Sequence, residues 1–404
     1  MNKMKKLLAL MLALVLVLAA CGGTTTPTEP TEPVEPTEPT EPAEPTEPTE
    51  PAEPTEPAEP TEPAEPNPEF GENSLYLITD LGTIDDKSFN QGSFEGLQKL
   101  GEEIGVEAKY LRPSGEGDQI YKQAVDQAVA AGAKIVVTPG FLFESAIGEA
   151  QAQYPDTKFI AVDFQPKSGD DYVVGDNTTS ILYKEEQAGF LAGYAAVKDG
   201  YTKLGFMGGV GVPAVVRYGF GFISGANYAA DELGIKVEVK FNYTGSFEAK
   251  PEIATMASSW YSSGTEVIFA CGGGIYASVL KAAQDNNGVM IGVDVDQKDQ
   301  GPEIITSAMK SLQKSVYDAA RSAVEGKFTG GETLNLGVES ERVQISDDFS
   351  RFKTFTKADY DAIYAKLVAN EGGVTSSIPN DTSNQDPTSF AADVPNVTIE
   401  YIAE

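Results

Sequence analysis

The sequence predicts an α/β protein with two doubly wound domains, and three observations lead to this prediction. Short apolar runs alternate with helical patterns from residue 74 onward. The alternation pauses at a longer helical stretch, roughly 181–199, and then restarts. This part of the chain has about 330 residues, which is too many for a single core of this kind. Repeated β-α-β units form parallel sheets with helices on both faces.

The individual elements follow from runs of four to eight residues rich in Val, Ile, Phe and Tyr, which favour strands. In the first array the expected strands are 74–79, 107–112, 134–139, 158–163 and 172–177, with helices near 88–104, 118–131 and 142–153. In the second array the expected strands are 203–209, 236–243, 266–272 and 289–294. The tail 371–389 is polar and rich in turn residues and suggests no role, whereas 395–402 resembles a strand.

This element order also predicts how the chain divides into lobes. We expect an N-terminal lobe from 71–178 and 303–338, and a C-terminal lobe from 179–302 and 339–404. The chain would then cross between the lobes near 177–181, 300–306 and 336–341.

The N-terminal residues indicate the compartment. Three lysines precede an apolar run, 7–20, which is too short for a membrane span but typical of a signal peptide. The run ends in 18-LAAC-21, which resembles a bacterial lipobox and implies cleavage after residue 20 and diacylation of Cys21. The alternative is an ordinary signal peptide followed by a chance cysteine. The first interpretation predicts an extracytoplasmic protein held by lipid at the outer face of the cell membrane.

A repeat follows, so that 21–70 is not expected to form a domain. From Thr28 to Pro66 the chain reads Thr/Ala/Val-Glu-Pro thirteen times. Proline at every third position fixes φ, and the glutamates repel one another, so no core can form. At about 3.1 Å per residue, an extended spacer of this length reaches on the order of 120 Å. A proline-rich ligand for another protein is the weaker alternative, because no basic or aromatic residue interrupts the repeat.

The net charge excludes some partners. Removing three signal-peptide lysines (+3) and fourteen glutamates of 29–69 (−14) from the total of −32 leaves −21 on residues 70–404. An acidic body is unsuited to nucleic acid or to an anionic membrane surface. The chain also has no N-terminal DNA-binding segment, which argues against a repressor.

The residue types limit the chemistry further. The chain has no histidine, so Ser-His-Asp catalysis and histidine metal sites are impossible. Once Cys21 is lipidated, Cys271 is the only thiol, and core packing in an apolar strand is its expected role. The glycine-rich turns 207–213 and 271–278 spell neither a dinucleotide fingerprint nor a P-loop. We therefore expect no cofactor, no metal and no enzymatic activity.

Acids and glycines stand where the expected strands end, the position that points at the ligand crevice in doubly wound folds. The residues at these ends are Asp80, Gly140, Asp163, Gly208, Gly209, 272–274 and Asp294. We expect the glycines to make tight turns that bring backbone amides near a ligand. A phosphate ligand is disfavoured, because the acids would repel it.

The order of several motifs resembles one family. The first is Thr79-Asp80-x-Gly82-x-x-Asp85-Asp86-x-Ser88-Phe89-Asn90, and the others are 136–163, 189-GFLAGYAA-196, 207-MGG with Pro213, Gly219-Phe220 with Gly225, 292-GVDVDQ-297 and 306-TSAMKSL-312. They cover essentially 74–340 and resemble the basic membrane protein (Bmp) family, whose best-understood members are purine-nucleoside receptors. The resemblance implies a type I periplasmic-binding-protein fold and a lipoprotein that serves an ABC importer through its permease and ATPase subunits.

The resemblance also implies binding residues for a base. An acid at Asp80 would accept hydrogen bonds from the base edge, Phe89 would stack on the purine, and Asn90 would offer a donor and an acceptor. Tyr218 is the candidate for the second face, with Trp260 as its rival. A structural alternative remains for this segment, in which Asp86 and Ser88 cap a helix and Phe89 faces a core.

The ribose would need different groups. Vicinal hydroxyls suit a carboxylate and an ammonium, and Asp294 and Lys310 fit these roles by resemblance. Asp163 is a further acid in a family binding position. The alternatives are that Asp296 is only a cap and that Lys310 is a surface lysine opposite an acid.

The predicted protein is thus a monomeric nucleoside receptor that closes over its ligand without breaking a bond. Two alternatives stay open. A type I binding protein for a sugar or another small ligand would keep the acids and an aromatic residue. A nucleoside hydrolase would need a calcium cage at 85–86 or 294–296, and neither pair has enough ligands. The sequence leaves open which nucleoside is preferred.

Overall fold

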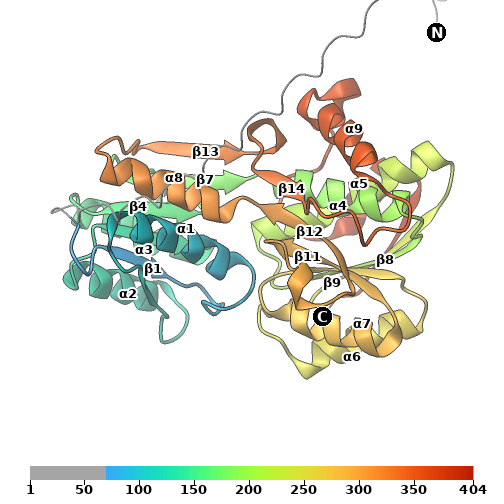
Figure 1. Ribbon diagram of the computed structural model, residues 1–404, viewed down its shortest axis with the longest axis horizontal. Coiled ribbons are helices and arrows are strands. Elements are labelled where there is room, and N and C mark those ends of the chain that lie inside the picture. Colours follow the sequence, from blue (N-terminus) through green and yellow to red (C-terminus); the bar gives the residue numbers. More distant parts are fainter. Residues whose placement is uncertain (1–69, 404) are drawn as a thin grey trace, which may run out of the picture. The chain divides into compact units, whose positions relative to one another are not determined.

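The computed structural model describes residues 70–403. The expected signal peptide, Cys21 and the Glu-Pro repeat therefore lie outside the described residues. Within 70–403, no helix is both long and apolar enough to cross a bilayer. The described chain forms two lobes, each built on one mainly parallel sheet (Figure 1).

The first lobe contains a six-stranded parallel sheet in the order β13-β7-β4-β3-β1-β2. The strands are β1 (Leu75–Ile78), β2 (Lys109–Leu111), β3 (Ile135–Pro139), β4 (Lys158–Val162), β7 (Thr178–Tyr183) and β13 (Glu332–Leu336). Helices cover both faces: α1 (Phe89–Ile104) and α8 (Leu312–Val324) lie on one, and α2 (Asp118–Ala130) and α3 (Glu144–Gln153) on the other. The central strands β1 and β3 are fully buried, as continuous apolar runs in a parallel sheet require.

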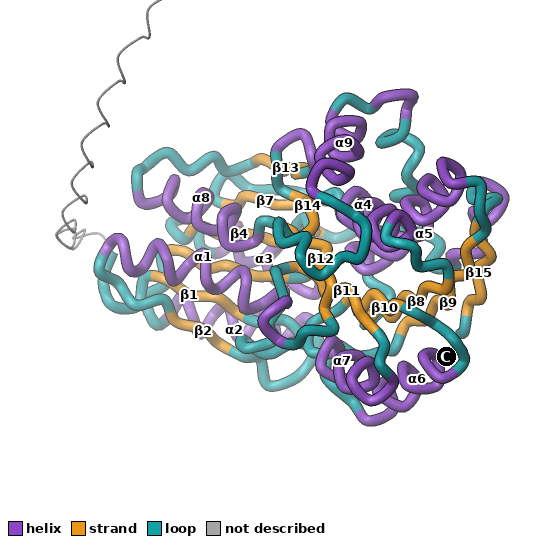
Figure 2. The backbone as a smooth tube through the Cα atoms, turned by 45° about the vertical axis from the view of Figure 1, so that its right-hand side comes forward, coloured by secondary structure: helices purple, strands orange, loops and turns teal. Residues whose placement is uncertain are grey.

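The second lobe contains a seven-stranded sheet in the order β14-β12-β11-β10-β8-β9-β15, in which only β14 is antiparallel. The strands are β8 (Lys203–Gly208), β9 (Val237–Tyr243), β10 (Val267–Cys271), β11 (Val289–Asp294), β12 (Ile304–Lys310), β14 (Val343–Ile345) and β15 (Val397–Tyr401). The helices α4 (Glu185–Lys198) and α5 (Pro213–Leu233) cover one face, with α9 (Lys357–Val368) against α4, and α6 (Pro251–Ser262) and α7 (Ile275–Asn286) cover the other (Figure 2).

The chain crosses between the lobes three times. It passes from β7 into α4, from β12 into α8, and from β13 into β14. The first two crossings are one residue long, at Lys184 and Ser311. The side chain of Gln187, in the first turn of α4, accepts a hydrogen bond from the Val338 amide at the third crossing (2.8 Å). The start of α4 thus lies at the junction of the lobes.

The first expected crossing is displaced, and one expected strand is wrong. The segment 172–177 does not form the fifth strand; instead β6 (Asp171–Tyr172) pairs only with β5 (Lys167–Ser168) in a short hairpin. The fifth strand is β7, which pairs with both β4 and β13, and α4 begins at residue 185 rather than near 181. The physical reason is that β7, TTSILY, is rich in β-branched and aromatic residues and is almost entirely buried, whereas Val173 is exposed, Val174 is half-buried, and Asp176 and Asn177 form a turn.

The expected lobe boundaries also differ from the structure around β12. The expected N-terminal lobe includes 303–338, but β12 lies between β11 and β14 in the second sheet. The second crossing therefore follows Lys310 rather than residue 302. The apolar sequence of β12 is compatible with a buried strand in either sheet. Only the strands with which it pairs show that it belongs to the second sheet.

The helices α4 and α5 pack unusually closely. A Cβ added to Gly189 would lie 2.1 Å from the Tyr218 carbonyl oxygen, and one added to Gly193 would lie 2.0 Å from that of Phe222. On α5, Gly221 and Gly225 meet α4 backbone oxygens in the same way. Glycine at these four positions lets the two backbones touch, which fixes the two helices relative to each other.

The tail has a structural role that the sequence does not suggest. The segment expected as a strand, 395–402, forms β15 at the edge of the second sheet, beside β9. Before it, the Gln385 side chain donates a hydrogen bond to the Gly211 carbonyl (2.5 Å), and the Phe390 ring contacts Phe220 of α5. The tail thereby contacts the loop between β8 and α5.

Candidate functional site

A cavity lies between the lobes, at the carboxyl ends of both sheets. The space among its lining residues is about 690 Å³, part of it open to solvent. All seven binding residues expected from the sequence line it: Asp80, Phe89, Asn90, Asp163, Tyr218, Asp294 and Lys310. They come from six different elements or loops, far apart along the chain.

Asp86 has the structural role considered for it. Its Oδ1 accepts hydrogen bonds from the Ser88 and Gln91 amides (2.9 and 3.1 Å), and its Oδ2 accepts one from the Asn90 amide (3.0 Å). These amides belong to the start of α1, so Asp86 caps the helix. Burial raises the pKa of Asp86 to about 6, although these hydrogen bonds counteract the effect.

Asn90 holds the acids in place instead of facing the ligand freely. Its Nδ2 donates to Asp80 Oδ1 (2.9 Å) and to Asp86 Oδ2 (3.0 Å), while its Oδ1 accepts from the Asp80 amide (3.3 Å). Both ends of the amide are therefore engaged within the protein. The structure favours a supporting role for Asn90 over the hydrogen bonding to a base that the sequence analysis expects.

Asp80 presents one carboxylate oxygen to the cavity. Its Oδ1 accepts from the Gly82 amide (2.8 Å) as well as from Asn90, and no hydrogen bond within residues 70–403 is formed by its Oδ2. Burial raises the pKa of Asp80. A Cβ on Gly140, where φ is 105°, would lie 3.0 Å from this Oδ2, so a glycine there keeps the space beside the acid open.

Two further acids stand in equivalent positions on the two lobes. Asp163 directly follows β4 in the first lobe, and Asp294 ends β11 in the second. Both have left-handed backbones, with φ of 66° and 67°, a conformation that aspartate tolerates better than most residues. Backbone strain of this kind is concentrated at functional sites.

Lys310 lies between these two acids. Its Nζ is 2.6 Å from Asp163 Oδ2 and 3.3 Å from Asp294 Oδ1, and all three side chains are buried. Glu185 Oε1 is a third carboxylate oxygen nearby, at 3.8 Å. Lys310 is therefore not a surface lysine opposite an acid, as the alternative interpretation had it.

The charges in this cluster perturb one another. Burial lowers the pKa of Lys310, but the three surrounding carboxylates outweigh it and raise this pKa overall. Burial raises the pKa of Asp163 to about 7, because Lys310 offsets the effect of burial only in part and the neighbouring Glu185 and Asp294 raise this pKa further. Asp163 Oδ1 is buried and has no hydrogen-bond partner among the described residues. Such an oxygen is an acceptor for a ligand hydroxyl or amine.

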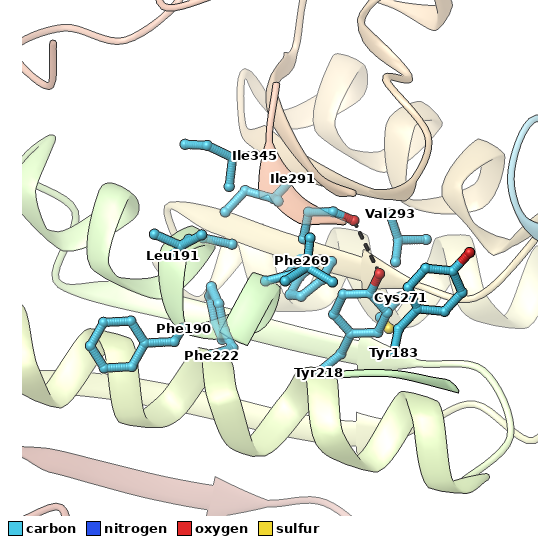
Figure 3. Packing of buried hydrophobic residues seen from close by; sticks show 14 of the residues in the cluster. Tyr183, Phe190, Leu191, Tyr218, Phe222, Phe269, Cys271, Ile291, Val293 and Ile345 are labelled. Carbon is cyan, nitrogen blue, oxygen red and sulfur yellow. Dashed lines mark hydrogen bonds between the residues drawn. The ribbon is translucent and has the colours of Figure 1, made fainter. Parts of the chain in front are cut away.

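Aromatic rings complete the cavity wall. The ring centre of Phe89 lies 4.5 Å from Lys310 Nζ, and Phe89 is partly buried in the cleft. Tyr218 lies in the second turn of α5, where its hydroxyl donates to the Ala308 carbonyl oxygen (3.4 Å), the hydrogen bond drawn in Figure 3. The same view places its ring beside Cys271, which is buried as expected.

Trp260, the rival to Tyr218, lies elsewhere. It packs in the apolar core beneath β8, where its ring would contact a Cβ on Gly205 at 2.9 Å, and it does not line the cavity. The structure supplies another aromatic residue, Phe247, in the loop after β9. Its ring lies against Gly209 and Gly272, at the carboxyl ends of β8 and β10. The position of Phe247 just after a strand end is the one signal that sequence reasoning passed over.

The lobes also touch each other beside the cavity. Ser88 Oγ of the first lobe donates to Asp294 Oδ2 of the second (2.5 Å), and the Gln297 side chain donates to the Lys87 carbonyl (2.9 Å). These contacts hold the start of α1 against the end of β11. Asp294 is thus shared between Ser88, Lys310 and the cavity.

The acids considered for a calcium cage have other partners. Asp296 accepts hydrogen bonds from the Lys298 amide (3.2 Å) and from Ser346 Oγ (3.0 Å), which is the capping role considered for it. Asp86 caps α1, as described above. Within residues 70–403, no three acidic or cysteine side chains converge in a group that could hold a metal ion.

The family model described as "ABC transporter substrate-binding protein PnrA-like" (Bmp) matches residues 74–377, about three quarters of the chain. Two curated relatives are similar to it. The "CD4+ T-cell-stimulating antigen" of Listeria monocytogenes is 33% identical over 67% of this chain and 79% of its own length. The "ABC transporter nucleoside-binding protein BmpA" of Lactococcus lactis is 29% identical over 69% of this chain and 85% of its own.

Solved structures support the fold. A solute-binding protein of an ABC transporter system from Aeropyrum pernix matches with a TM-score of 0.62 and 23% identity, covering 80% of this chain and 86% of its own. One from Conexibacter woesei matches with a TM-score of 0.59 and 21% identity, covering 74% and 97%. The two lobes thus have the type I periplasmic-binding-protein fold. The chain belongs to the PnrA-like (Bmp) family of ABC transporter substrate-binding proteins, which bind a small ligand outside the cytoplasm for the permease and ATPase subunits of an importer.

Proposed function

We propose that this protein binds a nucleoside, with purine nucleosides as the preferred class, in the cleft between its lobes. The observation that carries the proposal is the cluster of Lys310, Asp163 and Asp294 beside an aromatic wall. Vicinal ribose hydroxyls donate to carboxylates and accept from an ammonium, so this cluster offers both kinds of partner. Asp163 Oδ1, buried without a partner, is the acceptor that a hydroxyl would satisfy.

The rest of the cavity suits a base. Phe89 from the first lobe and Tyr218 or Phe247 from the second offer aromatic surfaces, and stacking on such surfaces contributes about 1–3 kcal/mol per base. Asp80, with its free oxygen, would accept from an N–H on the base edge. The printed name of the L. lactis relative, a nucleoside-binding protein, agrees with this assignment.

Binding would then proceed by closure without a chemical step. The ligand enters between the lobes, and closure replaces the water around its ring and hydroxyls with fixed polar partners. The cross-lobe hydrogen bond from Ser88 to Asp294 would form as the lobes meet. We expect the nucleoside to be returned intact, because the site contains binding groups and no activated nucleophile.

The test uses residues 70–404, stripped of ligand by denaturation and then refolded. Mass spectrometry of the released material would identify any ligand carried through purification. Inosine, guanosine and adenosine should each raise the Tm, since a ligand at a hundred times its Kd adds about 2.7 kcal/mol. Uridine, ribose and glucose are compared in parallel.

The variant Asp294→Ala should abolish the nucleoside response, whereas Asp296→Asn is the matched control, two residues away and outside the cavity. A sugar in the extract, with no response to any nucleoside, would contradict the proposed ligand class. Nucleobase release on prolonged incubation would instead favour a hydrolase.

We also propose that Cys21 carries a lipid anchor and that the body acts as a monomer. Several relatives bear the name lipoprotein, including one of Pyrococcus abyssi that is 28% identical over 70% of this chain. Growth with an alkyne-labelled fatty acid should label the wild-type protein and not Cys21→Ser. A labelled Cys21→Ser protein would contradict the anchor, and a dimer by light scattering would contradict the monomer.

A further inference from the structure

A second layer of charge lies next to Lys310, in residues that the cavity does not expose. Glu185 is the first residue of α4 and is 0% exposed. It does not line the cavity, yet its Oε1 lies 3.8 Å from Lys310 Nζ. Glu185 therefore cannot meet a ligand directly, but it can act on the ammonium that does.

Arg217 holds the other oxygen of the same carboxylate. Its Nε donates to Glu185 Oε2 at 2.6 Å, and Arg217 is itself largely buried in the second turn of α5, next to Tyr218. This pair joins the starts of α4 and α5, which the close glycine packing holds together. Glu185 Oε1 is left without a hydrogen-bond partner among the described residues.

The charges of this arrangement decide where Lys310 lies. An ammonium among three carboxylates would be drawn to whichever is least neutralised. Arg217 partly neutralises Glu185, which leaves Asp163 and Asp294 as the nearer partners, at 2.6 and 3.3 Å. Without Glu185 and Arg217, Lys310 would lose the attraction of the Glu185 carboxylate, which together with Asp163 and Asp294 sets the direction of its N–H donors. With Glu185 but no Arg217, Lys310 would be pulled away from the cavity.

The position of the pair at the lobe junction adds to this control. Glu185 directly follows the first crossing, at Lys184, and Lys310 directly precedes the second, at Ser311. Both residues are thus fixed by backbone that changes lobe within one residue. Lys310 joins Asp163 of one lobe to Asp294 of the other at this junction.

We propose that Glu185 and Arg217 are positioning residues for Lys310, and that they set the preference of the site for ligands with two adjacent hydroxyl groups. The proposal rests on the proposed function, because it concerns how the nucleoside site recognises the ribose. A correctly placed ammonium and its two acids serve both hydroxyls of a ribose, whereas a displaced ammonium loses this advantage.

The experiment compares inosine with 2′-deoxyinosine by calorimetry on refolded, ligand-free protein. The wild type should prefer inosine, and Glu185→Gln should reduce this preference about tenfold, the effect of 1.4 kcal/mol. The variant Glu185→Gln/Arg217→Gln removes both charges, so no unpaired buried cation threatens folding, and it should show the same reduced preference. The ratio of the two affinities is measured because a general loss of protein stability would weaken the binding of both ligands equally and leave this ratio unchanged.

The matched control is Asp199→Asn at the other end of α4. Asp199 is also buried, and its Oδ1 accepts from the Thr354 and Phe355 amides (2.6 and 3.0 Å), far from Lys310 in the sequence and outside the cavity. It should lower the Tm without changing the inosine preference.

Two results would overturn the inference in distinguishable ways. An unchanged preference in both Glu185 variants would show that the pair only supports the fold, and the proposed function would stand. A wild-type protein that binds neither nucleoside would contradict the proposed function and remove this inference with it.

Discussion

Lys310 Nζ lies 2.6 Å from Asp163 Oδ2, and this buried ion pair joins the two lobes at the floor of the cavity. Lys310 ends β12 of the second sheet, and Asp163 follows β4 of the first sheet. Because Asp294 shares the same ammonium, one cation serves acids from both lobes.

Replacing Lys310 with methionine should destabilise the ligand-free protein by about 3–5 kcal/mol at pH 8, since it leaves buried carboxylates without a counterion. The loss should be smaller at pH 5. Without the ammonium, the pKa of Asp163 rises further, so that at pH 5 this acid is protonated in the folded state and its charge no longer opposes folding. Urea denaturation at the two pH values measures this difference. An equal loss at both would contradict the charge argument.

Glu186 should make the folded state less stable as the pH rises. Burial and the adjacent Glu185 raise its pKa from 4.5 to about 7. Between these values the folded state binds more protons than the unfolded chain, so its stability falls with increasing pH, by at most about 3 kcal/mol. Glu186→Gln removes this dependence. The Tm of the variant relative to wild type should therefore rise between pH 4.5 and 7 and level off above; a constant difference would contradict the prediction.

Ser88→Ala should speed the release of bound nucleoside. The mutation removes the 2.5 Å hydrogen bond that joins the start of α1 to Asp294 across the cleft, and a single bond of this kind to a charged group contributes about 1.5–3 kcal/mol. Stopped-flow release of a fluorescent nucleoside should show a faster off-rate. The control is Ser93→Ala in the same helix, since Ser93 Oγ bonds only to the Phe89 carbonyl (2.8 Å) within the first lobe. Equal rates in both variants would exclude Ser88 as a cross-lobe contact.

Gly193→Ala should destabilise the second lobe, although alanine favours helices. Its Cβ would lie 2.0 Å from the Phe222 carbonyl oxygen, so α4 and α5 would have to separate, at a cost of about 1–3 kcal/mol. Differential scanning calorimetry measures the loss. Gly71→Ala, where nothing lies within 4 Å of the added Cβ, should leave the Tm unchanged. A Gly193→Ala protein as stable as wild type would show that the helices can separate freely.

The sequence by itself determined the fold class and most of the residues that line the cavity. Apolar runs alternating with helical patterns are enough to predict two doubly wound lobes, because the strands of a parallel sheet buried on both faces have continuous apolar sequences. The placement of Asp80, Asp163 and Asp294 at the cavity follows from the same rule, since strand ends in these folds meet at the ligand crevice. The family motifs added Phe89, Tyr218 and Lys310, all of which line the cavity.

Only the tertiary structure decided which hydrogen bonds and ion pairs these residues form and which of their side chains face the cavity. The amide of Asn90 has the right chemistry for a base, but in the fold its Nδ2 donates to the Asp80 and Asp86 carboxylates and its Oδ1 accepts from the Asp80 backbone amide. Trp260 and Phe247 could not be distinguished by residue type, because only the packing of the second lobe places Trp260 in its core and Phe247 at the carboxyl ends of β8 and β10, beside the cavity. The strand β12 and the partnership of Glu185 with Arg217 likewise depend on pairings between segments distant in the chain. Local sequence specifies strands, helices and caps, whereas such long-range contacts are fixed only when the whole chain packs.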